Sequence, residues 1–176
     1  MTTKTGSTIT VPASYISGAG TSRTFHAKLT VTSSSSDTAV SITAKGAVKC
    51  SSDWHGPWSG TLSSTGSGPS GSVSNKEATA GGATLVTNTK SVTRTHAAQT
   101  VKVTWTAWSY KYGSSHGSSA SISVNVPARP SYAVTYNNGG GTGTHASQTK
   151  WHSESLTLTL STVPTRTGYS FDGWYT

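Results

Sequence analysis

The residues best suited to contact a ligand form two aromatic groups. The first surrounds Pro57, and the second leads into the glycine-serine loop at 113–117. Aromatic rings beside hydroxyl and imidazole groups suit stacking on sugars, and loops on a rigid scaffold commonly bind ligands. In an alternative interpretation, the rings close the end of a domain that is poor in Leu and Phe. The candidate ligand-binding residues, for a glycan or a protein, are Trp54, His55, Trp58, Trp108, Tyr110 and Tyr112.

Catalytic chemistry has little support in the residue types of this chain. A glycosidase needs two facing carboxylates. The chain has five acidic residues, and no two of them suggest such a pair. Serine and histidine are frequent enough that some lie close together by chance. We therefore expect a protein that is not an enzyme and has no catalytic residue.

Metal ligands are also scarce. Cys50, Asp53 and His55 form one short cluster, whereas a structural zinc site needs a full set of closely spaced Cys or His ligands. The loop carboxylates are too few to surround a calcium ion. We expect no metal and no cofactor. A single cysteine also excludes an intrachain disulfide.

The formal net charge of +8 comes from thirteen basic and five acidic residues. The basic residues are scattered and form no tail or arm. This balance predicts a weak attraction to acidic polymers such as teichoic acid, without a dedicated nucleic-acid site. No stretch is long and apolar enough to span a membrane. The N-terminus has no apolar segment typical of a signal peptide.

Period-2 alternation of apolar and polar residues is frequent, and helical periodicity is almost absent. The segments 23–32 and 38–48 predict a hairpin. Alternation in these segments and in 99–108 and 118–126 predicts the inward face. The residues expected to face inward are Phe25, Ala27, Leu29, Val31, Val40, Ile42, Ala44, Val101, Val103, Trp105, Ala107, Ala120, Ile122, Val124 and Val126. About seven short strands favour an Ig-like sandwich without its usual disulfide. The strands are expected at 7–11, 23–32, 38–48, 71–74, 84–95, 99–108 and 118–126.

Two prolines, Pro127 and Pro130, interrupt this pattern. Such a spacing excludes a central strand and favours an extended linker. We expect an Ig-like sandwich at 1–128, a linker at 129–131 and a second small β-domain at 132–176. Its strands are expected at 132–136, 148–151, 156–160 and 169–175.

The second β-domain carries a specific motif. Tyr132–Tyr136 runs into Asn137-Asn-Gly-Gly-Gly, and Pro164-Thr-Arg-Thr-Gly-Tyr-Ser-Phe-Asp-Gly-Trp follows near the end. These residues resemble the Listeria–Bacteroides repeat, also called the internalin B-repeat. The resemblance implies a β-grasp-like fold found in bacterial surface and phage proteins. Because that repeat continues beyond its Gly-Trp strand, we expect an incomplete copy here. Gly168 and Gly173 bracket a Tyr-x-Phe pair that is expected to bury its rings on one face.

The N-terminal part resembles, more loosely, structural proteins of siphophages of Gram-positive hosts. Thr93-Arg-Thr-His96, Thr100-Val-Lys-Val103 and a Trp-rich turn at 54–61 carry this resemblance. It implies a non-enzymatic phage tail protein that is structural or decorating and contributes to host attachment. Its expected partners are other tail proteins or copies of itself, with host cell-wall glycan or teichoic acid as a further partner. We expect a location in the virion, after assembly in the host cytoplasm. The alternative is a glycan-binding adhesin module on a bacterial cell surface.

Overall fold

The computed structural model is all-β in its described residues, which are 1–11, 23–50, 56–78, 81–109, 117–159 and 162–175. The chain divides into two compact units, Met1–Ala128 and Arg129–Thr176. The first is a sandwich of two antiparallel sheets, and the second contains a small sheet of its own. These features confirm the predicted fold class. Within the described part of the chain, no helix is long and apolar enough to cross a membrane.

The first sheet of the sandwich is built on a long hairpin. β3 (Arg23–Ser35) and β4 (Ala39–Cys50) pair along their length, and β7 (Ala83–Thr93) pairs with the other side of β4. The outer edge of β3 is covered in two parts, by β1 (Thr2–Thr5) and β2 (Ile9–Val11). The hairpin predicted from alternation is therefore confirmed.

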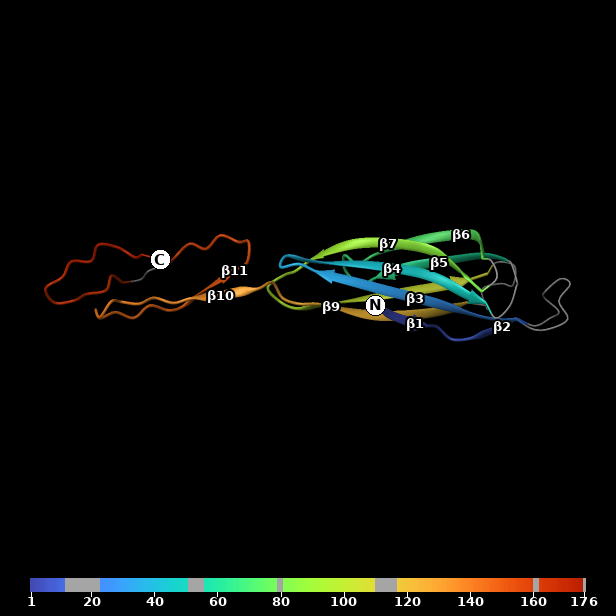
Figure 1. Ribbon diagram of the computed structural model, residues 1–176, viewed down its shortest axis with the longest axis horizontal. Coiled ribbons are helices and arrows are strands. Elements are labelled where there is room, and N and C mark those ends of the chain that lie inside the picture. The colour runs from blue at the N-terminus through green and yellow to red at the C-terminus, as the bar shows by residue number, and fades with distance from the viewer. Residues whose placement is uncertain (12–22, 51–55, 79–80, 110–116, 160–161, 176) are drawn as a thin grey trace. The chain divides into compact units, whose positions relative to one another are not determined.

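The second sheet has the order β6-β5-β8-β9. Its strands are β5 (Gly56–Ser64), β6 (Gly71–Ala78), β8 (Gln99–Trp108) and β9 (Ser118–Val126). β5 and β6 lie between β4 and β7 in the chain but belong to the other sheet from them, and Figure 1 shows β3, β4 and β7 running alongside one another. Since β4 pairs with β7 while β5 pairs with β8, the two central pairs are interleaved along the chain. Neither sheet forms from one continuous stretch, so the two sheets depend on each other.

The hydrophobic core lies between the two sheets. The inward faces predicted from alternation are buried, which confirms them. Each large side chain that is fully buried stabilises the fold by about 1.5–3 kcal/mol. The confirmed inward residues are Phe25, Ala27, Leu29, Val31, Val40, Ile42, Ala44, Val101, Val103, Trp105, Ala107, Ala120, Ile122, Val124 and Val126.

The Trp-rich segment at 54–61 was expected to be a turn, and this expectation is wrong for its described part. Residues 56–61 belong to β5, which pairs with both β6 and β8. Glycine and proline obscure the alternation there, and the β5–β6 register shifts between Trp58 and Gly60. Pro57 is tolerated because the pairing of β5 with β8 begins only at Ser59.

The edge formed by β1, β2 and β3 is closed by a side chain from the other sheet. Ser118 on β9 is buried. Its Oγ accepts a hydrogen bond from the Ala27 amide at 3.2 Å and donates one to the Ser7 carbonyl at 2.7 Å. These bonds lie in the gap between β1 and β2, where the Gly6 amide also donates to the Ala27 carbonyl at 2.7 Å. The hydroxyl therefore replaces ladder bonds that the interrupted edge strand does not supply.

Arg94 fixes the end of the sandwich that precedes the second unit. Its guanidinium donates to the carbonyls of Pro127, Ala128 and Ser36, with a distance of 2.7 Å for the last. Its backbone amide donates to the Thr38 carbonyl. Arginine suits this position because its fork of donors serves several carbonyls at once. Within the motif Thr93-Arg-Thr-His96, the described contacts of Arg94 are thus structural.

The second unit contains β10 (Ser131–Val134) and β11 (Gln148–Trp151), which pair antiparallel. The strand expected at 148–151 is confirmed, and the one expected at 132–136 is shorter and begins one residue earlier. The strand expected at 169–175 is wrong, because this segment forms only a bridge between Tyr169 and Arg166. The described residues at 156–159 are not strand either.

Candidate functional site

The candidate site is a groove in the second unit, and it begins with the Asn-Gly loop. The Asn137 Oδ1 accepts the Gly139 amide at 2.9 Å, which closes a tight turn. Gly139 and Gly140 have φ of 60° and 83°, a region that glycine enters without steric cost. The Asn138 side-chain amide donates to the Gly143 carbonyl at 2.6 Å. Hydrogen bonds and glycine conformations within residues 137–143 therefore determine the shape of this loop.

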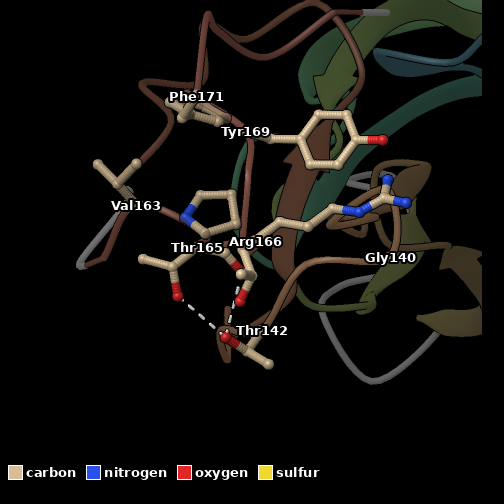
Figure 2. Close-up of a pocket in the computed structure, with 9 residues that line it drawn as sticks. Gly140, Thr142, Val163, Thr165, Arg166, Tyr169 and Phe171 are labelled. Carbon is tan, nitrogen blue, oxygen red and sulfur yellow. Dashed lines mark hydrogen bonds between the residues drawn. The ribbon is translucent and has the colours of Figure 1, made fainter.

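The loop is joined to the Pro-Thr-Arg segment by paired threonines. The amides and carbonyls of Thr142 and Thr165 bond reciprocally at 2.8 and 3.0 Å. Their hydroxyls lie 3.0 Å apart, and the Thr142 hydroxyl also lies 3.2 Å from the Thr165 carbonyl. Figure 2 shows the Thr142 and Thr165 side chains meeting along the dashed hydrogen bonds. The pair positions the two walls of the groove.

A second tight turn places a cation against an aromatic ring. The Tyr169 amide donates to the Arg166 carbonyl at 3.1 Å, and Gly168 within the turn has a φ of 81°. The Arg166 Cζ consequently lies 4.3 Å from the centroid of the Tyr169 ring, a cation–π arrangement. One guanidinium nitrogen also donates to the Gly139 carbonyl at 3.1 Å. The guanidinium is held in place while the Tyr169 ring stays 68% exposed.

The resulting groove has a volume of about 730 Å³. Figure 2 shows Tyr169 and Arg166 side by side, with Phe171 and Val163 on the same segment. Val163 and Phe171 are 61% and 41% exposed, while Pro164 is buried. The groove therefore offers one guanidinium, three threonine hydroxyls, the Tyr169 phenol and an apolar wall. The lining residues are Gly140, Thr142, Val163, Pro164, Thr165, Arg166, Thr167, Tyr169 and Phe171.

A cluster of rings lies beside the groove. Trp174 has ring centroids 5.3 Å from Tyr136, 5.0 Å from His145 and 5.5 Å from Phe171. The edge-to-face geometry of these contacts is the favoured one for aromatic pairs. Tyr136 donates its hydroxyl to the Gln148 side chain on β11. The cluster therefore connects the small sheet to the segment that carries Phe171.

The expectation that Tyr169 and Phe171 bury their rings together is wrong. Tyr169 is mostly exposed and stacks on Arg166, whereas Phe171 turns toward Trp174. The two glycines bracket a turn and not a strand, so the alternation that pairs residues two apart does not apply. The sequence signal that could have located this site is the arginine two residues before Gly168.

Of the six predicted ligand-binding residues, the structure describes Trp58 and Trp108. Trp58 is 1% exposed and packs against Phe25, with ring centroids 5.2 Å apart. Its location matches the alternative in which the rings complete the sandwich. Trp108 is half-buried at the end of β8, opposite Ser59. Trp58 and Trp108 therefore face opposite sides of the second sheet. Trp54, His55, Tyr110 and Tyr112 lie outside the described residues.

One sequence pattern was missed. Gly113-Ser-Ser-His-Gly117 has the Gly-x-Ser-x-Gly spacing of a nucleophile elbow, around Ser115. An elbow stands between a strand and a helix. Residues 113–117 instead connect β8 to β9, which pair antiparallel. The flanking elements thus differ from those of an elbow, and residues 113–116 lie outside the described part of the chain. Among the described residues, no group of His, Cys, Asp and Glu is arranged to hold a metal ion.

The family model of the Listeria-Bacteroides repeat domain matches residues 132–176. The resemblance predicted for this stretch is therefore confirmed, and it covers about a quarter of the chain. The groove and the ring cluster both lie within the matched residues. Comparisons with curated proteins and with solved structures found no match.

Proposed function

We propose that this chain is a non-enzymatic structural or decorating module of a phage tail. We name the second unit, Arg129–Thr176, the repeat unit, and we propose that it contributes to attachment to the host surface. The observation that supports this proposal is the distribution of apolar side chains. Apart from Pro164, the buried apolar residues of the described chain all belong to the sandwich. Among the residues that the structure describes, and apart from Met1, the exposed large hydrophobic residues all belong to the repeat unit. The latter are Tyr132, Leu158, Val163, Tyr169, Phe171 and Tyr175.

This division favours a scaffold that presents a contact surface. Exposed apolar patches on otherwise polar proteins commonly mark interaction sites. The expected partners are other tail proteins or further copies of the chain, because assembly covers such surfaces and stabilises the folded state. The placement in a phage tail comes from the sequence resemblance of 93–103 to tail proteins, and the expected route is assembly in the host cytoplasm.

An antibody against the purified chain tests this placement. Immunogold electron microscopy of a lysate from producing cells should label tails of released virions. Labelling of the bacterial envelope, with unlabelled virions, contradicts the phage assignment and favours the adhesin.

Zymography on host peptidoglycan, with Ser115→Ala as the matched variant, tests the absence of enzymatic activity. A cleared zone that the variant loses would show a hydrolase.

A glycan-binding module of a bacterial surface protein is the second candidate, and the groove favours it. The Arg166 guanidinium stacks on the Tyr169 ring, and Thr142 and Thr165, whose hydroxyls contact each other, line the same groove. A ring that stacks on a sugar beside fixed polar groups is the usual design of such sites. We expect the unmodified chain to bind glycans on an array, and we expect the Tyr169→Ala variant to lose this binding. Tyr132→Ala removes an exposed ring outside the groove and should leave the signal unchanged.

A further inference from the structure

The outer face of the first sheet gathers basic residues at one end. We name His26, Lys28, Lys45 and Lys49 the basic corner. Their positions on β3 and β4 alternate with the buried residues of the same strands, so their side chains point away from the core. His26 lies directly opposite Lys49, and Lys45 lies opposite Thr30. The pairing register places the two basic residues of β3 beside the two of β4 on the same face of the sheet.

The distances in the basic corner follow from strand geometry. Side chains directly opposite each other on antiparallel strands have Cβ atoms about 5 Å apart. Lys45 and Lys49 are separated by about 13 Å along β4, at roughly 3.3 Å per residue. Lys28 lies opposite Ala47, which makes Lys45 and Lys49 its diagonal neighbours at about 7–8 Å, so the three positive charges repel one another. The arrangement therefore leaves a local excess of positive charge that a bound anion would neutralise.

A hollow lies within the basic corner. Its volume is about 230 Å³, and Lys28, Ala47 and Lys49 line it together with the turn at Gly81 and Gly82. The small Ala47 side chain stands between Lys45 and Lys49 on β4 and leaves space there. A Cβ added to Gly82 would lie 2.2 Å from the Val48 carbonyl oxygen, so only glycine lets this turn approach β4.

The charge of the basic corner acts on His26. Burial lowers the pKa of His26 below its ordinary value, and the positive charges of Lys49 and Lys28 lower it further. An anion in the hollow would oppose the effect of the two lysines. A rise in the pKa of His26 would therefore report that an anion occupies the hollow.

The described carboxylates of the sandwich lie elsewhere. Asp37 is in the turn between β3 and β4, at the opposite end of the hairpin from the His26–Lys49 pair. Glu77 is on β6 of the second sheet. Asp53 lies outside the described residues. On the described outer face, the neighbours of the basic corner are Ala47 and several threonines, including Thr30 on β3 and Thr84 on β7.

We propose that the basic corner binds a phosphodiester polymer whose repeating unit is a polyol. Lysines supply point charges for phosphate groups. Threonine hydroxyls beside them can both donate and accept hydrogen bonds, which suits the hydroxyls of a polyol. Proteins that bind single-stranded nucleic acid combine basic residues with aromatic stacking platforms, whereas the described neighbours here are hydroxyls and Ala47. The surroundings therefore favour the polyol polymer over a nucleic acid.

The test uses the full chain and de-acylated poly(glycerol phosphate) as the probe. We expect binding by calorimetry at low salt that weakens as salt is added. The double variant Lys28→Gln/Lys49→Gln should bind about tenfold more weakly or worse, since both lysines that line the hollow lose their positive charge. The charge-matched control Lys90→Gln/Lys102→Gln should keep the affinity. Lys90 lies opposite Ile42 toward the far end of the first sheet, and Lys102 lies on the second sheet.

Nuclear magnetic resonance of His26 gives an independent readout. The probe should raise the pKa of His26 in the unmodified chain. The Lys28→Gln/Lys49→Gln variant should have a higher His26 pKa without the probe and little further change with it. Equal weakening in both double variants, or an unchanged His26 pKa at saturation, refutes the site. An oligothymidylate that binds the corner as tightly as the polymer refutes the polyol assignment. These variants lie outside the groove of the repeat unit and should leave glycan binding there unchanged. A negative result at the basic corner would therefore not refute the proposed function of the groove.

Discussion

Trp105 shows how single residues determine the packing of this sandwich. Its ring lies between the two sheets and is fully buried, and its Nε1 donates to the Ala47 carbonyl of the facing sheet at 2.9 Å. A Cβ on Gly46 or Gly60 would lie 2.4 or 2.2 Å from ring atoms of Trp105. The ring therefore occupies a slot that exists only because both flanking residues lack a side chain.

Substitution of Gly60 by alanine tests this slot. The added methyl group overlaps the Trp105 ring, so Gly60→Ala should lower the free energy of unfolding by about 1–3 kcal/mol. Urea denaturation measures the change. The matched control is Gly71→Ala, whose Cβ would approach only Val86, at 3.2 Å. Equal stability of the two variants would contradict the packing described for Trp105.

Strands β1 and β9 form for different reasons, one because of a neighbouring strand edge and the other because of its own side-chain pattern. Alternation predicts β9, because every second residue from Ser118 to Val126 is buried. It does not predict β1, whose residues are all exposed and carry no alternation. β1 is a strand because the edge of β3 offers it hydrogen-bonding partners. Ser118 then connects this edge to the second sheet.

Removal of the Ser118 hydroxyl tests this connection. Ser118→Ala leaves the Ala27 amide and the Ser7 carbonyl without the bonds described above. We expect a loss of about 1–3 kcal/mol in the free energy of unfolding, which is the usual cost of leaving buried polar groups unpaired. Ser123→Ala on the same strand is the control, since Ser123 is exposed. Its effect should stay within about 0.5 kcal/mol. Hydrogen exchange should show faster exchange of the Ala27 amide only in the first variant.

The whole molecule combines two units that differ in how they are stabilised. The sandwich has a continuous hydrophobic core. In the described part of the repeat unit, Pro164 is the one buried residue, and the sheet has two strands. A two-stranded sheet is at best marginally stable in water. The repeat unit therefore depends on turns, paired threonines and ring contacts for its structure.

Limited proteolysis tests this difference. Trypsin should cleave after Lys150 and Arg166 before it cleaves within the described strands of the sandwich, because cleavage requires local opening of the backbone. Mass spectrometry of a time course identifies the fragments. Simultaneous loss of both units would contradict the expected order. A partner that covers the exposed rings should slow the first two cleavages.

The sequence by itself determined which residues of the long strands face the core. Side-chain alternation is a property of each strand alone, so Phe25, Ile42 and Trp105 could be assigned inward without knowledge of their partners. The glycine-rich motif likewise identified the repeat, because its turns are set by local backbone chemistry.

Only the tertiary structure decided which distant residues meet. Trp58 belongs to the core because β5 pairs on both sides, a relation that its local glycine and proline conceal. His26 meets Lys49 through strand register, and Thr142 meets Thr165 across the repeat. Such contacts depend on long-range pairing, whose partner cannot be read from a local pattern. The basic corner and the groove are both products of these pairings.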